Sequence, residues 1–250
     1  MRALSLFSGI GGLDLAAEAA GIEVAAMCEI EPFCRAVLRK HWPEIPIIHD
    51  IRELRGDEFG TVDIIFGGFP CQPVSVAGKQ RGQNDERWLW PEFARVIGTA
   101  NPDWIIAENV ENAVRTVLDG VISDLENLGY EVGTYCTEAY CSGAWFSDAR
   151  IFIVAASDDR RAVMRRDAQF STDAETCGRR RDNRRRAPGL DFGRWREEQS
   201  RPYGVVDGVS HRVDRLRALG NAVVPQQAYP FFRAIAEMDA AIRDKEDITS

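Results

Sequence analysis

The first 155 residues alternate between short apolar runs and longer segments in which apolar residues recur at helical spacing. Short apolar runs, which are typical of buried strands, occur at residues 3–7, 23–28, 45–50, 62–68, 103–109, 130–140 and 150–156. Helical spacing occurs at residues 13–20, 31–42, 91–100 and about 114–128. This alternation predicts an α/β protein with a mostly parallel sheet and helices on both of its faces.

The periodicity disappears after residue 156 and returns only near Val213. Residues 215–243 then predict a turn marked by glycine and proline, followed by a helix. We therefore expect one main domain, formed by residues 1–155 and 216–250, which a short separate region at residues 156–215 interrupts.

The net charge of −8 argues against a nucleic-acid partner until its distribution is considered. Residues 156–215 hold fifteen Arg and eleven Asp or Glu, a sum of +4, so the remainder of the chain carries −12. Blocks of like charge are often solvated surface. This block is internal to the chain, however, and a basic segment inserted into an acidic body suits a phosphate-rich partner.

The six cysteines show neither a CxxC pair nor a spacing typical of metal ligands. This pattern favours reduced thiols and a cytoplasmic protein. The sequence contains no run of about 18 apolar residues, so we expect no membrane-spanning helix.

Residues 7–15 form a glycine-rich turn after the first predicted strand. The turn lacks the G-x-G-x-x-G spacing, since Asp14 stands where the third glycine belongs, and this disfavours a nicotinamide site. Glu29 at the end of the second strand can bind ribose hydroxyls, Ile30 can pack on an adenine ring, and Asp50 can accept a hydrogen bond from the adenine amino group. Together they favour S-adenosylmethionine; a plain tight turn and a solvated carboxylate are the alternatives.

Cys71 follows the strand predicted at residues 62–68 and opens a loop rich in Gly, Gln and basic residues. In an α/β protein, ligands and chemistry collect at the carboxyl ends of the strands. A cysteine there can supply a thiolate nucleophile near neutral pH. The alternative is an inert buried cysteine.

Six short segments occur along the chain in the order FSGIGGLDL, CEIEP, HDI, GGFPCQPVSVAG, ENV and RALGNAVVP. They resemble the ordered motifs of the DNA (cytosine-5) methyltransferase family in its small prokaryotic or phage form, over residues 4–155 and 216–238. The resemblance implies a Rossmann-like methyltransferase fold with a seven-stranded sheet, S-adenosylmethionine as cofactor, no metal, and double-stranded DNA as substrate. It also implies DNA methylation in a restriction-modification setting, in the cytoplasm of a bacterial or phage-infected cell. We expect a monomer and leave a paired restriction endonuclease open.

The resemblance also assigns roles to residues. Cys71 is expected to add to carbon 6 of a flipped-out cytosine, and Glu108 to bind N3 and the exocyclic amine. Asn109 is expected to hold that geometry, and Arg150 to bind the cytosine carbonyl or to support Glu108. The implied cofactor-binding residues are Phe7, Ser8, Gly9, Gly11, Gly12, Leu13, Glu29, Ile30, Asp50, Ile51, Gly68, Asn221, Ala222 and Val223.

A base inside a duplex must be flipped out before it can be methylated. The loop from Gln72 to about Arg87 is expected to close over that base, with Gln72 filling the vacated stack. Candidate phosphate contacts, for which an ordinary solvated charge is the alternative, are Ser75, Lys79, Arg81, Arg87, Arg179, Arg180, Arg184 and Arg185. Residues 156–215 are the expected target-recognition region.

The chain departs from the family before its last predicted strand. The family usually carries a Gln-x-Arg-x-Arg element, whereas this chain has Phe146 and Asp148 in place of the glutamine and the first arginine, and only Arg150 matches. Two alternatives therefore stay open. One is an RNA cytosine-5 methyltransferase of the same family. The other is a catalytically impaired DNA-binding relative, which would not need Cys71 and Glu108 together.

Overall fold

The computed structural model of the protein describes residues 1–70, 88–110, 117–144, 146, 148–158, 160 and 212–249. Its sheet has seven strands in the order β3-β2-β1-β4-β5-β7-β6. The strands are β1 (Arg2–Leu6), β2 (Glu23–Cys28), β3 (Ile47–Ile48), β4 (Ile64–Gly68), β5 (Trp104–Val110), β6 (Tyr130–Glu138) and β7 (Ala149–Ser157). Strands β1 to β5 are parallel, and β7 runs antiparallel to both of its neighbours. The predicted α/β class with a mostly parallel sheet is confirmed.

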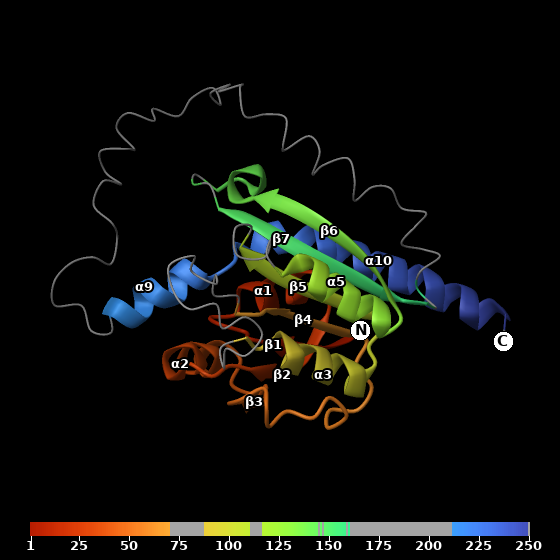
Figure 1. The fold of residues 1–250 in the computed structure, drawn as a ribbon, viewed down its shortest axis with the longest axis horizontal. Coiled ribbons are helices and arrows are strands. Elements are labelled where there is room, and N and C mark those ends of the chain that lie inside the picture. The colour runs from red at the N-terminus through yellow and green to blue at the C-terminus, as the bar shows by residue number, and fades with distance from the viewer. Residues whose placement is uncertain are drawn as a thin grey trace, which may run out of the picture.

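Helices cover both faces of the sheet (Figure 1). Helices α1 (Gly12–Ala19) and α10 (Pro225–Thr249) pack on one face, and α3 (Trp90–Ala100) and α5 (Leu118–Asn127) on the other. The other described helices are α2 (Pro32–His41) and α9 (Arg212–Asn221), with a short 3₁₀ turn η2 (Ala139–Ser142). Side chains alternate between two cores along each strand, because successive residues of a strand point to opposite faces. Ile64 and Phe66 belong to the core under α1 and α10, whereas Ile65 belongs to the core under α3 and α5.

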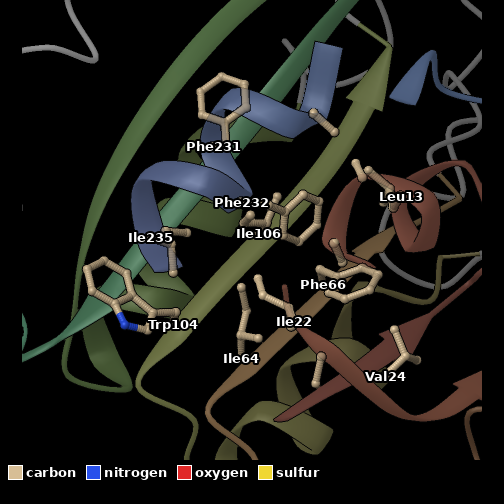
Figure 2. Close-up of a cluster of buried hydrophobic side chains, with 14 of the residues drawn as sticks. Leu13, Ile22, Val24, Ile64, Phe66, Trp104, Ile106, Phe231, Phe232 and Ile235 are labelled. Carbon is tan, nitrogen blue, oxygen red and sulfur yellow. The ribbon is translucent and has the colours of Figure 1, made fainter. Parts of the chain in front are cut away.

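Helix α10 brings the end of the chain back onto the sheet. Figure 2 shows Phe232 of this helix beside the strand residues Phe66 and Ile106. Phe231 stacks instead on Phe152 of β7, with the ring centroids 4.7 Å apart. The Phe232 ring meets Phe66 edge-on, with the ring centroids 4.9 Å apart. This contact joins α10 to a strand that lies about 160 residues earlier in the chain. Burial of such aromatic side chains supplies much of the stabilisation of a core.

An ion-pair network ties α10 to the edge of the sheet where β1, β4 and β5 begin. Arg243 lies 2.7 Å from Asp63 and 2.6 Å from Asp239. Arg160, just after β7, lies 3.0 Å from Asp103. Because Asp239 is almost fully buried, breaking its contacts would leave an uncompensated charge in the core, which is strongly unfavourable.

Two details differ from the expectations. The segment expected to form a turn before the last helix is itself helical as far as Asn221, since its Leu, Arg and Ala residues favour a helix and the turn begins only after Asn221. The third strand is limited to Ile47–Ile48, so Asp50 lies in the loop beyond it.

Within the described segments, no helix is both long and apolar enough to cross a membrane.

Candidate functional site

Most of the described candidate residues lie at one end of the strands, where the parallel strands finish and the antiparallel β7 begins. The glycine-rich turn follows β1, Glu29 follows β2, and Gly68 is the last residue of β4. Glu108 lies near the end of β5, and Val110 of the same strand pairs with Arg150 of β7. The carboxyl edge of a parallel sheet is the usual place for a ligand site in this fold class.

Close packing requires the glycines of the turn after β1. Gly9 and Gly11 have φ angles of 56° and 89°, in the left-handed region that only glycine adopts at little cost. A Cβ at Gly11 would overlap the Trp42 ring, and a Cβ at Gly12 would lie 2.7 Å from the carbonyl oxygen of Val223. The predicted contribution of residues 221–223 thus reaches this turn through a buried Val223.

Glu29 ties the turn to the second strand. Its two carboxylate oxygens each accept a 2.7 Å hydrogen bond, one from the backbone N–H of Gly9 and one from that of Glu31. Burial raises the pKa of Glu29 above its usual value. A carboxylate oxygen has two lone pairs, so each oxygen can still accept a hydrogen bond from a ligand hydroxyl. Beside it, Ile30 is 54% exposed, which is unusual for an isoleucine and leaves an apolar surface for a ring to pack on.

The other candidate cofactor residues belong to the loops near Glu29 and Ile30. Asp50 accepts a 3.0 Å hydrogen bond from the backbone N–H of Arg52. Its neighbour Ile51 is buried, as are Ser8 and Leu13. Phe7 has a φ of 53° and stacks on Phe93, with the ring centroids 6.2 Å apart. The Asp50 carboxylate also lies 3.6 Å from the Arg52 guanidinium, in the loop next to the one that carries Glu29.

Glu108 and Arg150 form a buried ion pair. The Arg150 Nη1 group donates a 3.0 Å hydrogen bond to Oε1 of Glu108, and both side chains are about 95% removed from solvent. Burial raises the pKa of Glu108 to about 7, against the opposing effect of Arg150. A carboxyl group with such a pKa can exchange a proton at neutral pH, which is the property expected of a general acid or base.

Asn109 joins β5 to the chain that leads toward Cys71. Its side-chain amide donates a 2.8 Å hydrogen bond to the carbonyl oxygen of Phe69 and accepts one of 2.9 Å from the backbone N–H of Val110. Phe69 is buried against the Trp90 ring, 5.1 Å away. The chain that leads to Cys71 is therefore held at Phe69, two residues before that cysteine.

Many of the predicted substrate contacts lie outside the described residues. They are Cys71, Gln72, Ser75, Lys79, Arg81, Arg87, Arg179, Arg180, Arg184 and Arg185. Of the last motif, Asn221 is exposed at the end of α9, and the carbonyl oxygen of Ala222 accepts a 3.4 Å hydrogen bond from Arg150.

Sequence reasoning missed Gln227, which connects the C-terminal helix to this edge. Gln227 is almost fully buried, and its amide donates a 2.9 Å hydrogen bond to the carbonyl oxygen of Asp148. The available signal was a pair of glutamines in the first turn of an otherwise apolar helix face. Its partner is 79 residues away in the chain, and no local pattern identifies such a contact.

Comparisons with known proteins agree with this geometry. Residues 1–186 match the family model described as C-5 cytosine-specific DNA methylase. The Type II methyltransferase M2.BsuMI of Bacillus subtilis (strain 168) is 33% identical over 164 residues, which are 62% of this chain and 42% of that protein. The Type II methyltransferase M.FnuDI of Fusobacterium nucleatum is 35% identical over 64% of this chain and 48% of its own length.

A crystal structure of a Spodoptera frugiperda DNMT2 mutant superposes with a TM-score of 0.55 at 26% identity, over 63% of this chain and 50% of that one. Each of these matches covers half or less of the relative's own length. The family model, by contrast, covers most of the 250 residues of this chain. The chain therefore belongs to the C-5 cytosine-specific DNA methylase family.

Proposed function

We propose that the chain is an S-adenosylmethionine-dependent DNA cytosine-5 methyltransferase. The observation that carries the proposal is the buried Glu108, whose pKa of about 7 lets it hold a proton at neutral pH. It lies one residue from Asn109, the anchor of the segment that leads into Cys71. A protonated carboxyl group and a nearby cysteine are the two groups that the reaction needs.

The residues of the loops after β1, β2 and β3 fit S-adenosylmethionine. Glu29 has lone pairs free for the ribose hydroxyls, the exposed Ile30 offers a surface for adenine, and Asp50 can accept from the adenine amino group. The glycines of the turn keep Cβ atoms out of the space near Trp42 and Val223. When bound, this cofactor supplies an electrophilic methyl group.

Cys71 and Glu108 would activate the cytosine. Carbon 5 of cytosine is a poor nucleophile until the Cys71 thiolate adds to carbon 6, because this addition breaks the aromatic system. Glu108 would donate a proton to N3 and so offset the negative charge that the addition creates. After methylation, a base, for which water is the candidate, removes the proton on carbon 5. The double bond between carbons 5 and 6 then forms again, the Cys71 thiolate leaves, and N3 returns its proton to Glu108.

The substrate and the division of labour along the chain are part of the proposal. Double-stranded DNA would present its target base flipped out, with residues 72–87 closing over it. Residues 156–215 would recognise the sequence, while residues 1–155 and 216–250 carry out catalysis.

A covalent trap tests the proposal. Duplex DNA that carries 5-fluorocytosine should form a stable adduct with the protein, since fluorine cannot leave as a proton does. Cys71→Ser should abolish the adduct, whereas Cys136→Ser, which changes an exposed cysteine of β6, should keep it. The duplexes form a random-sequence library synthesised with 5-fluorocytosine and are incubated with S-adenosylmethionine, because the target sequence has to be found in the same experiment.

Each outcome separates the candidate functions. An adduct that survives Cys71→Ser would remove this residue as the nucleophile. Methyl transfer to RNA but not to DNA would replace the proposal with the RNA enzyme. Binding of DNA without adduct or methyl transfer would leave a non-catalytic relative.

A further inference from the structure

The Arg150 guanidinium is shared between two carboxylates. Its Nε and Nη2 groups both donate to Oδ2 of Asp148, at 3.0 and 2.9 Å, while Nη1 donates to Oε1 of Glu108 at 3.0 Å. Nη2 also donates to the carbonyl oxygen of Ala222. Arginine has five N–H donors in a fixed plane. Nε and Nη2 are both engaged by Asp148, and Nη2 also by Ala222, so only Nη1 bonds to Glu108.

Asp148 is itself held in place by the backbone around it. Its carbonyl oxygen accepts hydrogen bonds from the buried Gln227 amide at 2.9 Å and from the backbone N–H of Ala139 at 3.2 Å. Its side chain is only 27% exposed. The backbone at Asp148 is thus held by contacts from η2 and from α10, which places this residue beside Arg150 independently of the ion pair.

The second oxygen of Glu108 points away from Arg150. A Cβ at Gly68 would lie 2.7 Å from this Oε2 atom, which places the oxygen beside the end of β4, from which the chain continues toward Cys71. Among the described residues, the charged groups that act on Glu108 are Arg150, which favours its ionised form, and Asp148, which opposes ionisation. The β4 residue next to the Glu108 side chain is Gly68, which carries no charge.

We propose that Asp148 is a positioning residue of the site: it occupies two N–H groups of Arg150, restricts that cation to a single hydrogen bond with Glu108, and so keeps Glu108 protonated for donation to the target base. The inference rests on the proposed function of Glu108. Asp148 stands where the family usually has an arginine, so in this chain a negative charge takes part in setting the proton affinity of the site.

The direction of the effect follows from the charges. Asp148→Asn removes a negative charge and frees Arg150 to bind Glu108 at two points, and both changes favour the ionised form of Glu108. The pKa of Glu108 should then fall. The protonated acid is the active form. As the pH rises, the variant should therefore lose its activity at a lower pH than the wild type does.

The test measures the proton on Glu108 directly, without substrate or cofactor. Protein labelled with ¹³C at the glutamate carboxyl carbons is titrated by NMR, and the signal that disappears in Glu108→Gln is assigned to Glu108. Asp148→Asn should lower the titration midpoint by about one pH unit or more. A second variant, Asp148→Ser, should lower it as well and serves if the first one does not fold.

Asp103→Asn is the matched control. Asp103 also pairs with a largely buried arginine, Arg160, at 3.0 Å, but at the opposite end of β5, about 16 Å away along the strand. This variant should leave the Glu108 midpoint unchanged. An unchanged midpoint in Asp148→Asn and Asp148→Ser would overturn the inference, as would an equal fall in the control.

A pH profile of methyl transfer separates this inference from the proposed function. If the midpoint falls and the alkaline limb of activity moves with it, both hold. If the midpoint falls while the limb stays, Asp148 does set the proton affinity of Glu108, and it is the proposed role of Glu108 as the acid that fails. A purely structural role for Asp148 would lower activity at every pH without moving the limb.

Discussion

The side chain of Asn109 bridges two neighbouring strands by donating a 2.8 Å hydrogen bond to the carbonyl oxygen of Phe69. The same side chain accepts a hydrogen bond from the backbone N–H of Val110, so its orientation is fixed from both ends. Glu108 precedes it in β5, and Cys71 comes two residues after Phe69. One amide thus couples the placement of the proposed acid to that of the proposed nucleophile.

We expect Asn109→Ala to slow formation of the covalent adduct, because it frees the anchored carbonyl of Phe69. Leaving that buried acceptor unpaired costs about 1–3 kcal/mol, so the free energy of unfolding should fall as well. Rapid-quench trapping with 5-fluorocytosine DNA measures the rate. Asn101→Ala, at the left-handed end of α3, should lower stability without slowing the adduct; a normal rate in Asn109→Ala would contradict the coupling.

Gly12→Ala should lower both stability and cofactor affinity. The added methyl group would lie 2.7 Å from the Val223 carbonyl oxygen, and overpacking of this kind typically costs about 1–3 kcal/mol. Gly120→Ala in α5 is the control, since a Cβ there meets nothing within 4 Å and should raise stability by up to about 1 kcal/mol. Urea unfolding and calorimetry with S-adenosylmethionine measure the two quantities; equal behaviour of both variants would refute the close packing.

Glu29→Ala should weaken S-adenosylmethionine binding by about 1.5–3 kcal/mol, the range for a hydrogen bond to a charged group. Its carboxylate also holds the backbone N–H groups of Gly9 and Glu31, so part of the loss comes from the loosened turn. Calorimetry reports the affinity, and circular dichroism checks that the fold is intact. If the affinity does not change, the ribose is held elsewhere.

Asp14 should make the protein less stable as the pH rises from about 4 to about 7. Burial raises its pKa from 3.8 to about 7, so in this window the folded protein keeps a proton that the unfolded chain releases, and stability falls with pH. Asp14→Asn removes this penalty. Its free energy of unfolding relative to wild type should therefore improve between pH 4 and pH 8, by an amount on the order of 1–4 kcal/mol.

Urea titrations at the two pH values check this expectation. Asn101→Ala, which removes no ionisable group, should differ from wild type by the same amount at both pH values. A pH-independent difference for Asp14→Asn would show that the buried carboxyl does not titrate in this window.

The arginines of residues 179–186 should make DNA binding depend steeply on salt. The residues outside 156–215 carry −12 and repel DNA, so binding has to rely on local cations. Replacing Arg179, Arg180, Arg181, Arg184, Arg185 and Arg186 with Gln should flatten the log–log salt slope by about 0.9 for each phosphate that an arginine no longer neutralises. Cofactor affinity should stay the same. An unaltered salt slope would indicate that the recognition contacts lie in residues 187–215 instead.

Sequence patterns predicted the strands of this protein well, because parallel strands that are buried on both faces consist of apolar runs. The run at 103–109 therefore predicted β5, and with it the place of Glu108 at the end of the strand. The extent of α9 was missed, since Gly220 was interpreted as the start of a turn. The engagement of Arg150 by Asp148 could not be predicted, because two residues of one short segment can point toward each other or apart. The contact of Gln227 with the Asp148 carbonyl depends on where α10 packs, which is a property of the whole core.

The antiparallel direction of β7 has a consequence for how the family's specificity can change. β7 begins beside the proposed site and ends at the opposite edge, where Arg160 binds Asp103, and the chain is back at the site when it reaches Ala222. Crossing the sheet takes about seven extended residues, or about 23 Å, whereas residues 161–211 provide 51. The proposed site is built from the described strands and helices on either side of this segment, so we expect that the segment can be exchanged for one of another length or sequence while the frame that holds Glu108 and Arg150 stays the same.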